Sequence, residues 1–158
     1  MRNFISLFTL AVLSTTAVSA QALTAKQTVE KETSVIGADG AVQTVRETVE
    51  TIVPGERIIY SLDFENDKSE PANDIVLTMP IPAEVQYIEG TADNPQSNVT
   101  FSADGGENFS SRQSVMVMDT AGNIRAAGAG ELTHIRWSVP GPVQAGDSGV
   151  LSFAASVK

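Results

Sequence analysis

Hydrophobic and polar residues alternate with a period of two along much of the chain, which is the pattern of β-strands with one buried face. In the clearest run, Ile58, Tyr60, Leu62 and Phe64 share one side, and the residues between them are mostly polar. In residues 115–118 both sides are apolar, so we expect that strand to be buried on both faces. Further strands are predicted in residues 85–89, 99–102, 132–139 and 151–157.

Turn-forming residues separate these runs. Pro54 and Gly55 favour a turn because proline presets one backbone angle and glycine tolerates a positive φ. Pro80 and Pro82 lack an amide donor and are therefore expected to end a strand. No long segment after residue 20 has helical periodicity, and many short strands between frequent turns are typical of a β-sandwich or β-barrel. Other turns are predicted at residues 103–106, 121–123, 140–142 and 145–147.

Residues 21–52 are predicted to form a separate, charged β-hairpin. The segment QTVEKETSV at 27–35 resembles QTVRETVETIV at 43–53, and Gly37 and Gly40 lie between the two. Two strands rich in Thr and Val that flank a glycine-containing turn are typical of a hairpin. Because edge strands are commonly protected by charge, we expect this hairpin at a sheet edge. The charged residues concerned are Glu30, Lys31, Glu32, Arg46, Glu47 and Glu50.

Residues 1–20 have the layout of a secretory signal peptide. Arg2 gives a positive start, residues 4–13 are mostly apolar, and small residues follow. The apolar run is shorter than the about 20 residues that span a bilayer; the alternative is a retained N-terminal anchor. Cleavage fits after Ala20 or after Ala22. We therefore predict an exported protein, periplasmic or extracellular, with no transmembrane segment after cleavage.

The composition excludes several kinds of site. The 158 residues suffice for one domain, and they include no Cys and one His. Disulfides, thiolate metal sites, cysteine nucleophiles and multi-histidine metal sites within the chain are thus excluded. A formal net charge of -9 argues against nucleic acid as a partner. Trp137, the one tryptophan, is the best candidate for the centre of the core; the alternative is a surface tryptophan that stacks on a sugar.

The densest cluster of carboxylates lies in residues 63–74. Asp63, Glu65, Asp67 and Asp74 are candidate Ca²⁺ ligands, because calcium prefers oxygen ligands from such loops. The order of an EF-hand loop is not present, and the competing interpretation is a solvated loop. His134 lies in a predicted strand with a charged neighbour on the same face, which favours a surface histidine over a general base.

The segment from residue 53 to residue 90 also carries a family pattern. The matching positions are Pro54, Gly55, Tyr60, Asn66, Ala72, Val76, Pro82, Tyr87 and Gly90. With Trp137 and residues 145–148 near the end, the order and spacing resemble the conserved-repeat Ig-like domains of bacterial surface proteins, domain-of-unknown-function family eleven, over residues 50–158. Met79 and Asp67 stand where that family usually has Asp and Gly. The resemblance implies an Ig-like antiparallel β-sandwich at residues 53–158 and no catalytic residues.

Together these observations favour an all-β, non-enzymatic protein with a structural or protein-interaction role at the cell envelope or surface. Its partners are expected to be other envelope or surface proteins, and strand addition at the hairpin is one way to bind them. No cofactor is predicted. The alternative is a β-sandwich module that binds calcium or carbohydrate.

Overall fold

A computed structural model describes residues 23–49 and 51–158. The predicted signal peptide and its cleavage site lie outside the described residues. The prediction of an all-β chain is confirmed, and all strand pairs are antiparallel. No helix in the described part of the chain is long and apolar enough to cross a membrane.

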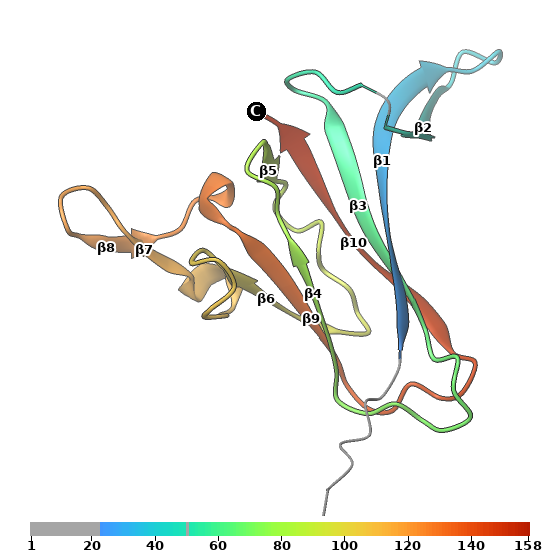
Figure 1. Ribbon diagram of the computed structural model, residues 1–158. Coiled ribbons are helices and arrows are strands. Elements are labelled where there is room, and N and C mark those ends of the chain that lie inside the picture. The colour runs from blue at the N-terminus through green and yellow to red at the C-terminus, as the bar shows by residue number, and fades with distance from the viewer. Residues whose placement is uncertain (1–22, 50) are drawn as a thin grey trace, which may run out of the picture.

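The largest sheet has five strands in the order β2-β1-β3-β10-β5. The long central strand β3 pairs with β1 on one side and with β10 on the other. Figure 1 shows β1, β3 and β10 side by side in one layer, with β2 beside the far end of β1. The strands are β1 (Thr24–Ile36), β2 (Val42–Thr48), β3 (Arg57–Glu65), β5 (Val85–Tyr87) and β10 (Ser148–Val157).

The described residues form two smaller sheets as well. The first has the order β4-β9-β6, with β4 (Ile75–Pro80), β9 (His134–Val139) and β6 (Asn98–Ser102). The second is a two-stranded hairpin of β7 (Met116–Met118) and β8 (Ile124–Ala126), which projects from the rest of the fold in Figure 1. Two short 3₁₀ helices, η1 (Arg112–Ser114) and η2 (Ala129–Glu131), lie between strands.

The main core lies between the five-stranded and the three-stranded sheets, and both contribute to one cluster of buried side chains. Tyr60 of β3 and Phe153 of β10 stack with their ring centroids 4.9 Å apart. Trp137 of β9 is fully buried, and its Nε1 donates a hydrogen bond to the carbonyl oxygen of Ala92 (2.9 Å). The sequence-based placement of Trp137 in the core therefore holds, and the indole N–H is satisfied as burial requires.

One predicted strand has a different environment from the one expected. Residues 115–118 were expected to be buried on both faces, but Met116 and Met118 are 56% and 71% exposed. The reason is that, among the described strands, β7 pairs with β8 alone, in a two-stranded ribbon that has just one face toward the core. Val117 packs partly against the core from that face.

Candidate functional site

The open edge of the five-stranded sheet is the most distinctive surface of the described residues. β2 is the terminal strand, and it pairs only with β1 among the described strands. Six of its seven residues are exposed; Val45 is the half-buried exception. The far edge of β2 is therefore a row of backbone groups without a strand partner in the described part of the chain.

The turn between β1 and β2 determines which backbone groups face that open edge. Gly37 N donates to the carbonyl oxygen of Ala41 (2.8 Å), and Asp39 Oδ1 accepts from Ala41 N (3.0 Å). Hydrogen-bonded and non-hydrogen-bonded pairs alternate along an antiparallel ladder from such a point. By this alternation, the residues of β2 that turn their N–H and C=O groups away from β1 are Val42, Thr44, Arg46 and Thr48.

Ion pairs hold the hairpin to the rest of the sheet. Glu32 on β1 lies between two arginines: Arg46 Nε on β2 is 3.6 Å from its carboxylate, and Arg57 Nε on β3 is 2.8 Å away. On the opposite face, Lys31 Nζ is 3.0 Å from Glu56 Oε1. Each of these pairs is partly exposed, so each stabilises the sheet only modestly. They join β1 to β2 on one side and to the beginning of β3 on the other.

The edge has a step, because β1 is longer than β2. β2 covers β1 only from Glu30 to Ile36, whereas residues 24–29 pair with β3 alone. The same alternation directs backbone groups of Ala25, Gln27 and Val29 outward. The open edge thus consists of β2 and of this lower part of β1.

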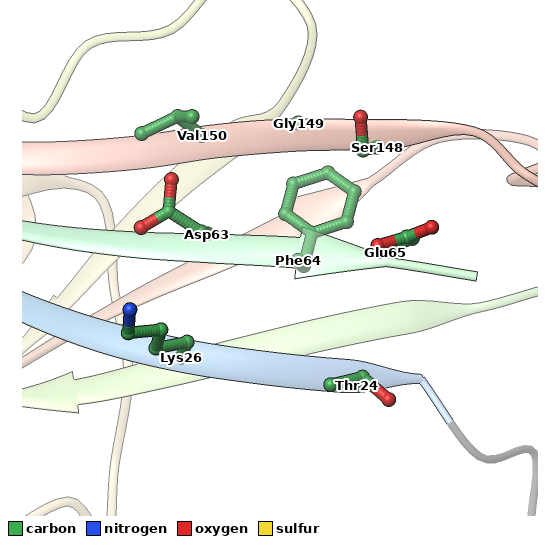
Figure 2. A pocket seen from close by; sticks show the side chains of 8 residues that line it. All are labelled: Thr24, Lys26, Asp63, Phe64, Glu65, Ser148, Gly149 and Val150. Atoms are coloured by element: carbon green, nitrogen blue, oxygen red, sulfur yellow. The ribbon is translucent and has the colours of Figure 1, made fainter. Parts of the chain in front are cut away.

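A shallow hollow of about 330 Å³ lies at the lower corner of the sheet, next to the step. Figure 2 shows Lys26, Asp63 and Val150 in one row across β1, β3 and β10, with a second row of Thr24, Glu65 and Ser148. Lys26 makes no ion pair with a carboxylate within the described residues. At this corner, Lys26 therefore lies next to the open strand edge without an ion-pair partner among the described residues.

The four predicted calcium ligands are not gathered into one site. No group of three or more His, Asp or Glu residues suited to a metal ion occurs among residues 23–49 and 51–158. Asp63 and Glu65 lie on β3 and line the hollow, whereas Asp74 lies at the other end of the loop, directly before β4, with a φ of 53°. Asp67 accepts a hydrogen bond from Thr24 Oγ1 (2.8 Å) and lies 3.0 Å from Lys68 Nζ. These contacts lower the pKa of Asp67, the one with Lys68 most strongly. Calcium binding at these residues was the alternative interpretation of the sequence, and it stays untested.

Asn66 organises this loop, a role that the sequence alone did not reveal. It is 1% exposed, and its Nδ2 donates to the carbonyl oxygens of Glu70 (2.8 Å) and Val143 (2.9 Å). The carbonyl of Asn66 also accepts from Gly146 N (2.8 Å). Asn66 thereby ties the end of β3 to the segment that leads into β10. The only signal in the sequence was its position in the family pattern.

His134 is half-buried at the beginning of β9. Its Nδ1 lies 3.2 Å from Thr133 Oγ1, a hydroxyl rather than a carboxylate.

Asp104 caps the loop that follows β6. Its Oδ1 accepts hydrogen bonds from Glu107 N, Asn108 N and Ser102 Oγ. These hydrogen bonds, led by the one from Asn108, hold the pKa of Asp104 far below its usual range. The carboxylate is thus fixed in its charged form as part of the loop.

Comparison with known proteins adds no identity to these observations. No family model matches the chain, and no curated protein or solved structure matches it. The resemblance to conserved-repeat Ig-like domains accordingly remains a prediction from the residues.

Proposed function

We propose that this protein is an exported, non-enzymatic domain that binds other envelope or surface proteins by strand addition at the open edge formed by β2 and residues 24–29 of β1. The observation that carries the proposal is the exposed terminal strand β2, whose outward backbone groups have no strand partner among the described residues. In strand addition, main-chain hydrogen bonds provide affinity and neighbouring side chains provide specificity.

The side chains of the edge suit a protein partner. A long open edge is a hazard unless charge or a partner covers it. Here the charges are few: within β2 only Arg46 and Glu47 are charged, and Arg46 is already engaged by Glu32. Ile36 and Val42, which pair across the hairpin, are 77% and 71% exposed. This combination of free backbone and exposed apolar side chains supports binding of an extended segment.

For the fold, we propose the Ig-like sandwich that the sequence pattern implies. Its support is the main core that the two larger sheets share, in which Trp137 is fully buried. Export rests on the signal-like residues 1–20, and it would place the edge where other envelope proteins can reach it.

Site-specific photo-crosslinking in the producing cell tests the proposal. A photoreactive residue at Thr44, on the open edge, should give covalent adducts with a protein, identified by mass spectrometry. The matched control is Val76, which is 52% exposed on β4 of the other sheet. Introducing Thr44→Pro while the photoreactive residue is at Thr48 should abolish the edge adducts, because it removes an outward amide. Adducts from Val76 alone, or edge adducts that persist with Thr44→Pro, would refute strand addition.

A further inference from the structure

The sequence of β2 is complementary to itself. We propose that β2 pairs with β2 of a second copy of this chain, so that the two five-stranded sheets join into one continuous sheet. This inference rests on the proposed function, because it names the partner of the same edge. In a symmetric antiparallel pair with full overlap, Val45 lies opposite Val45 of the second copy, and Val42 lies opposite its Thr48.

Backbone geometry favours this register. The outward-facing residues Val42, Thr44, Arg46 and Thr48 all find partners in it: Thr44 opposes Arg46 of the second copy, and Val42 opposes Thr48. These become the hydrogen-bonded pairs. Val45 then forms the central non-hydrogen-bonded pair, the kind in which side chains approach most closely. The overlap uses the whole of β2.

Charge and the length of the overlap distinguish this register from its two symmetric neighbours. With full overlap, Arg46 opposes Thr44 and Glu47 opposes Gln43, so no like charges face one another. If the overlap of the two strands is centred on Arg46 instead, Arg46 lies opposite Arg46 of the second copy, and this pair of like charges is unfavourable. If the overlap is centred on Thr44, only residues 42–46 of β2 in each copy are paired. Full overlap is thus the symmetric register that pairs all seven residues of β2 and places no like charges opposite one another.

The electrostatics of the whole chain are compatible with this pairing. A net charge of -9 makes two copies repel at long range. β2 itself carries one Arg and one Glu and is locally neutral, so the repulsion does not concentrate at the interface. Added salt should screen the long-range repulsion and strengthen the dimer.

Sedimentation equilibrium on the mature chain tests the dimer first. The expected result is a concentration-dependent dimer that Thr44→Pro converts to a monomer. Thr44→Val, which keeps the amide, is the matched control and should remain dimeric. Thermal unfolding of both variants verifies that the sheet is intact, since proline is tolerated where an edge amide faces solvent. A monomer throughout a dilution series that reaches millimolar protein would overturn the inference.

Single cysteines test the register, because the chain has no cysteine of its own. Val45→Cys should form an intermolecular disulfide rapidly under mild oxidation, since opposite residues of a non-hydrogen-bonded pair meet the distance requirement. Gln43→Cys lies opposite Glu47 of the second copy and should cross-link far more slowly. Equal rates for the two variants, or no cross-link from Val45→Cys, would refute this register.

Charge substitutions at Gln43 give an independent readout. Gln43→Lys places a cation opposite Glu47 of the second copy and should tighten the dimer roughly fivefold, whereas Gln43→Glu should weaken it by a similar factor. Identical dissociation constants for Gln43→Lys and Gln43→Glu would contradict the pairing.

The photo-crosslinking experiment distinguishes failure of the dimer from failure of the proposed function. A monomeric protein that still gives adducts with another protein from Thr44 would overturn the dimer but would leave strand addition unaffected. Loss of those adducts as well would overturn both.

Discussion

The ring of Phe64 lies over the α-carbon of Gly149, its direct cross-strand partner on β10. A Cβ placed on Gly149 would come within 2.5 Å of Phe64 Cζ, closer than side-chain atoms can approach. Phe64 packs against both hydrophobic clusters from this position. Because Gly149 has no side chain, the ring of Phe64 can pack over it and cover this corner of the five-stranded sheet.

Gly149→Ala should destabilise the protein by about 1–3 kcal/mol, because the added methyl group forces Phe64 out of its place. Urea unfolding of both proteins measures the difference. Gly130→Ala is the matched control, since its Cβ would meet Gln86 only at 3.5 Å, an ordinary contact. In a Phe64→Ala background the cost of Gly149→Ala should largely vanish. An equal cost in both backgrounds would show that Phe64 is not the obstacle.

Trp137→Phe should reduce the free energy of unfolding by roughly 2–4 kcal/mol. The change leaves a cavity in the core, and it removes the N–H that satisfies the carbonyl of Ala92. Urea unfolding monitored by circular dichroism gives the value, because the fluorescence of the only tryptophan is lost. Val76→Ala, at an exposed position, should change stability by less than about 0.5 kcal/mol. A comparable loss for both variants would place the main core elsewhere.

The sequence predicted those features that depend on local alternation. The strand at 57–65 and the burial of Trp137 followed from a period of two and from side-chain size. The contact between Phe64 and Gly149 could not be predicted, because it depends on which strands become neighbours. Register between β3 and β10 is a long-range property, and no local pattern encodes it.

The candidate edge was predicted in part. Charge and the repeated Thr and Val pattern suggested an edge hairpin, but its step was not foreseen. β1 begins at Thr24, in residues that lack a clear apolar alternation, and its pairing with β3 supplies the stability that propensity does not. The apolar composition of residues 115–118 predicted burial on both faces, whereas the side chains at 116 and 118 are exposed. Apolar residues on a two-stranded ribbon can remain in solvent.

Glu131 should make the stability of the protein depend on pH in the acid range. Its carboxylate pairs with Arg125 and accepts from Gly128 N, and these contacts, led by Arg125, lower the pKa of Glu131 to about 2. A carboxylate with a lowered pKa in the folded state stabilises the protein above its ordinary pKa. That contribution should be lost as the pH falls from the ordinary value of 4.5 to about 2.

The measurement is the midpoint of urea unfolding across this pH range for the wild-type protein and Glu131→Gln. The wild-type curve should fall more steeply with decreasing pH, and the two curves should converge at the acid end. Glu70→Gln is the control, because Glu70 forms no ion pair within the described residues. Parallel curves for wild type and Glu131→Gln would contradict the coupling between Glu131 and Arg125.

Calcium should leave the thermal midpoint of a protein that comprises residues 21–158 unchanged. Asp67, the central acidic residue of the loop, is engaged by Lys68 and Thr24, and Asn66 holds the loop through buried hydrogen bonds rather than through an ion. A ligand that binds only the folded state raises the midpoint by mass action, so unfolding in EDTA and then in excess Ca²⁺ is a direct measurement. Mg²⁺ at equal ionic strength controls for screening. A rise of several degrees with Ca²⁺ alone, abolished by Asp63→Asn, would show that Asp63 and its neighbours bind the ion after rearrangement of the loop.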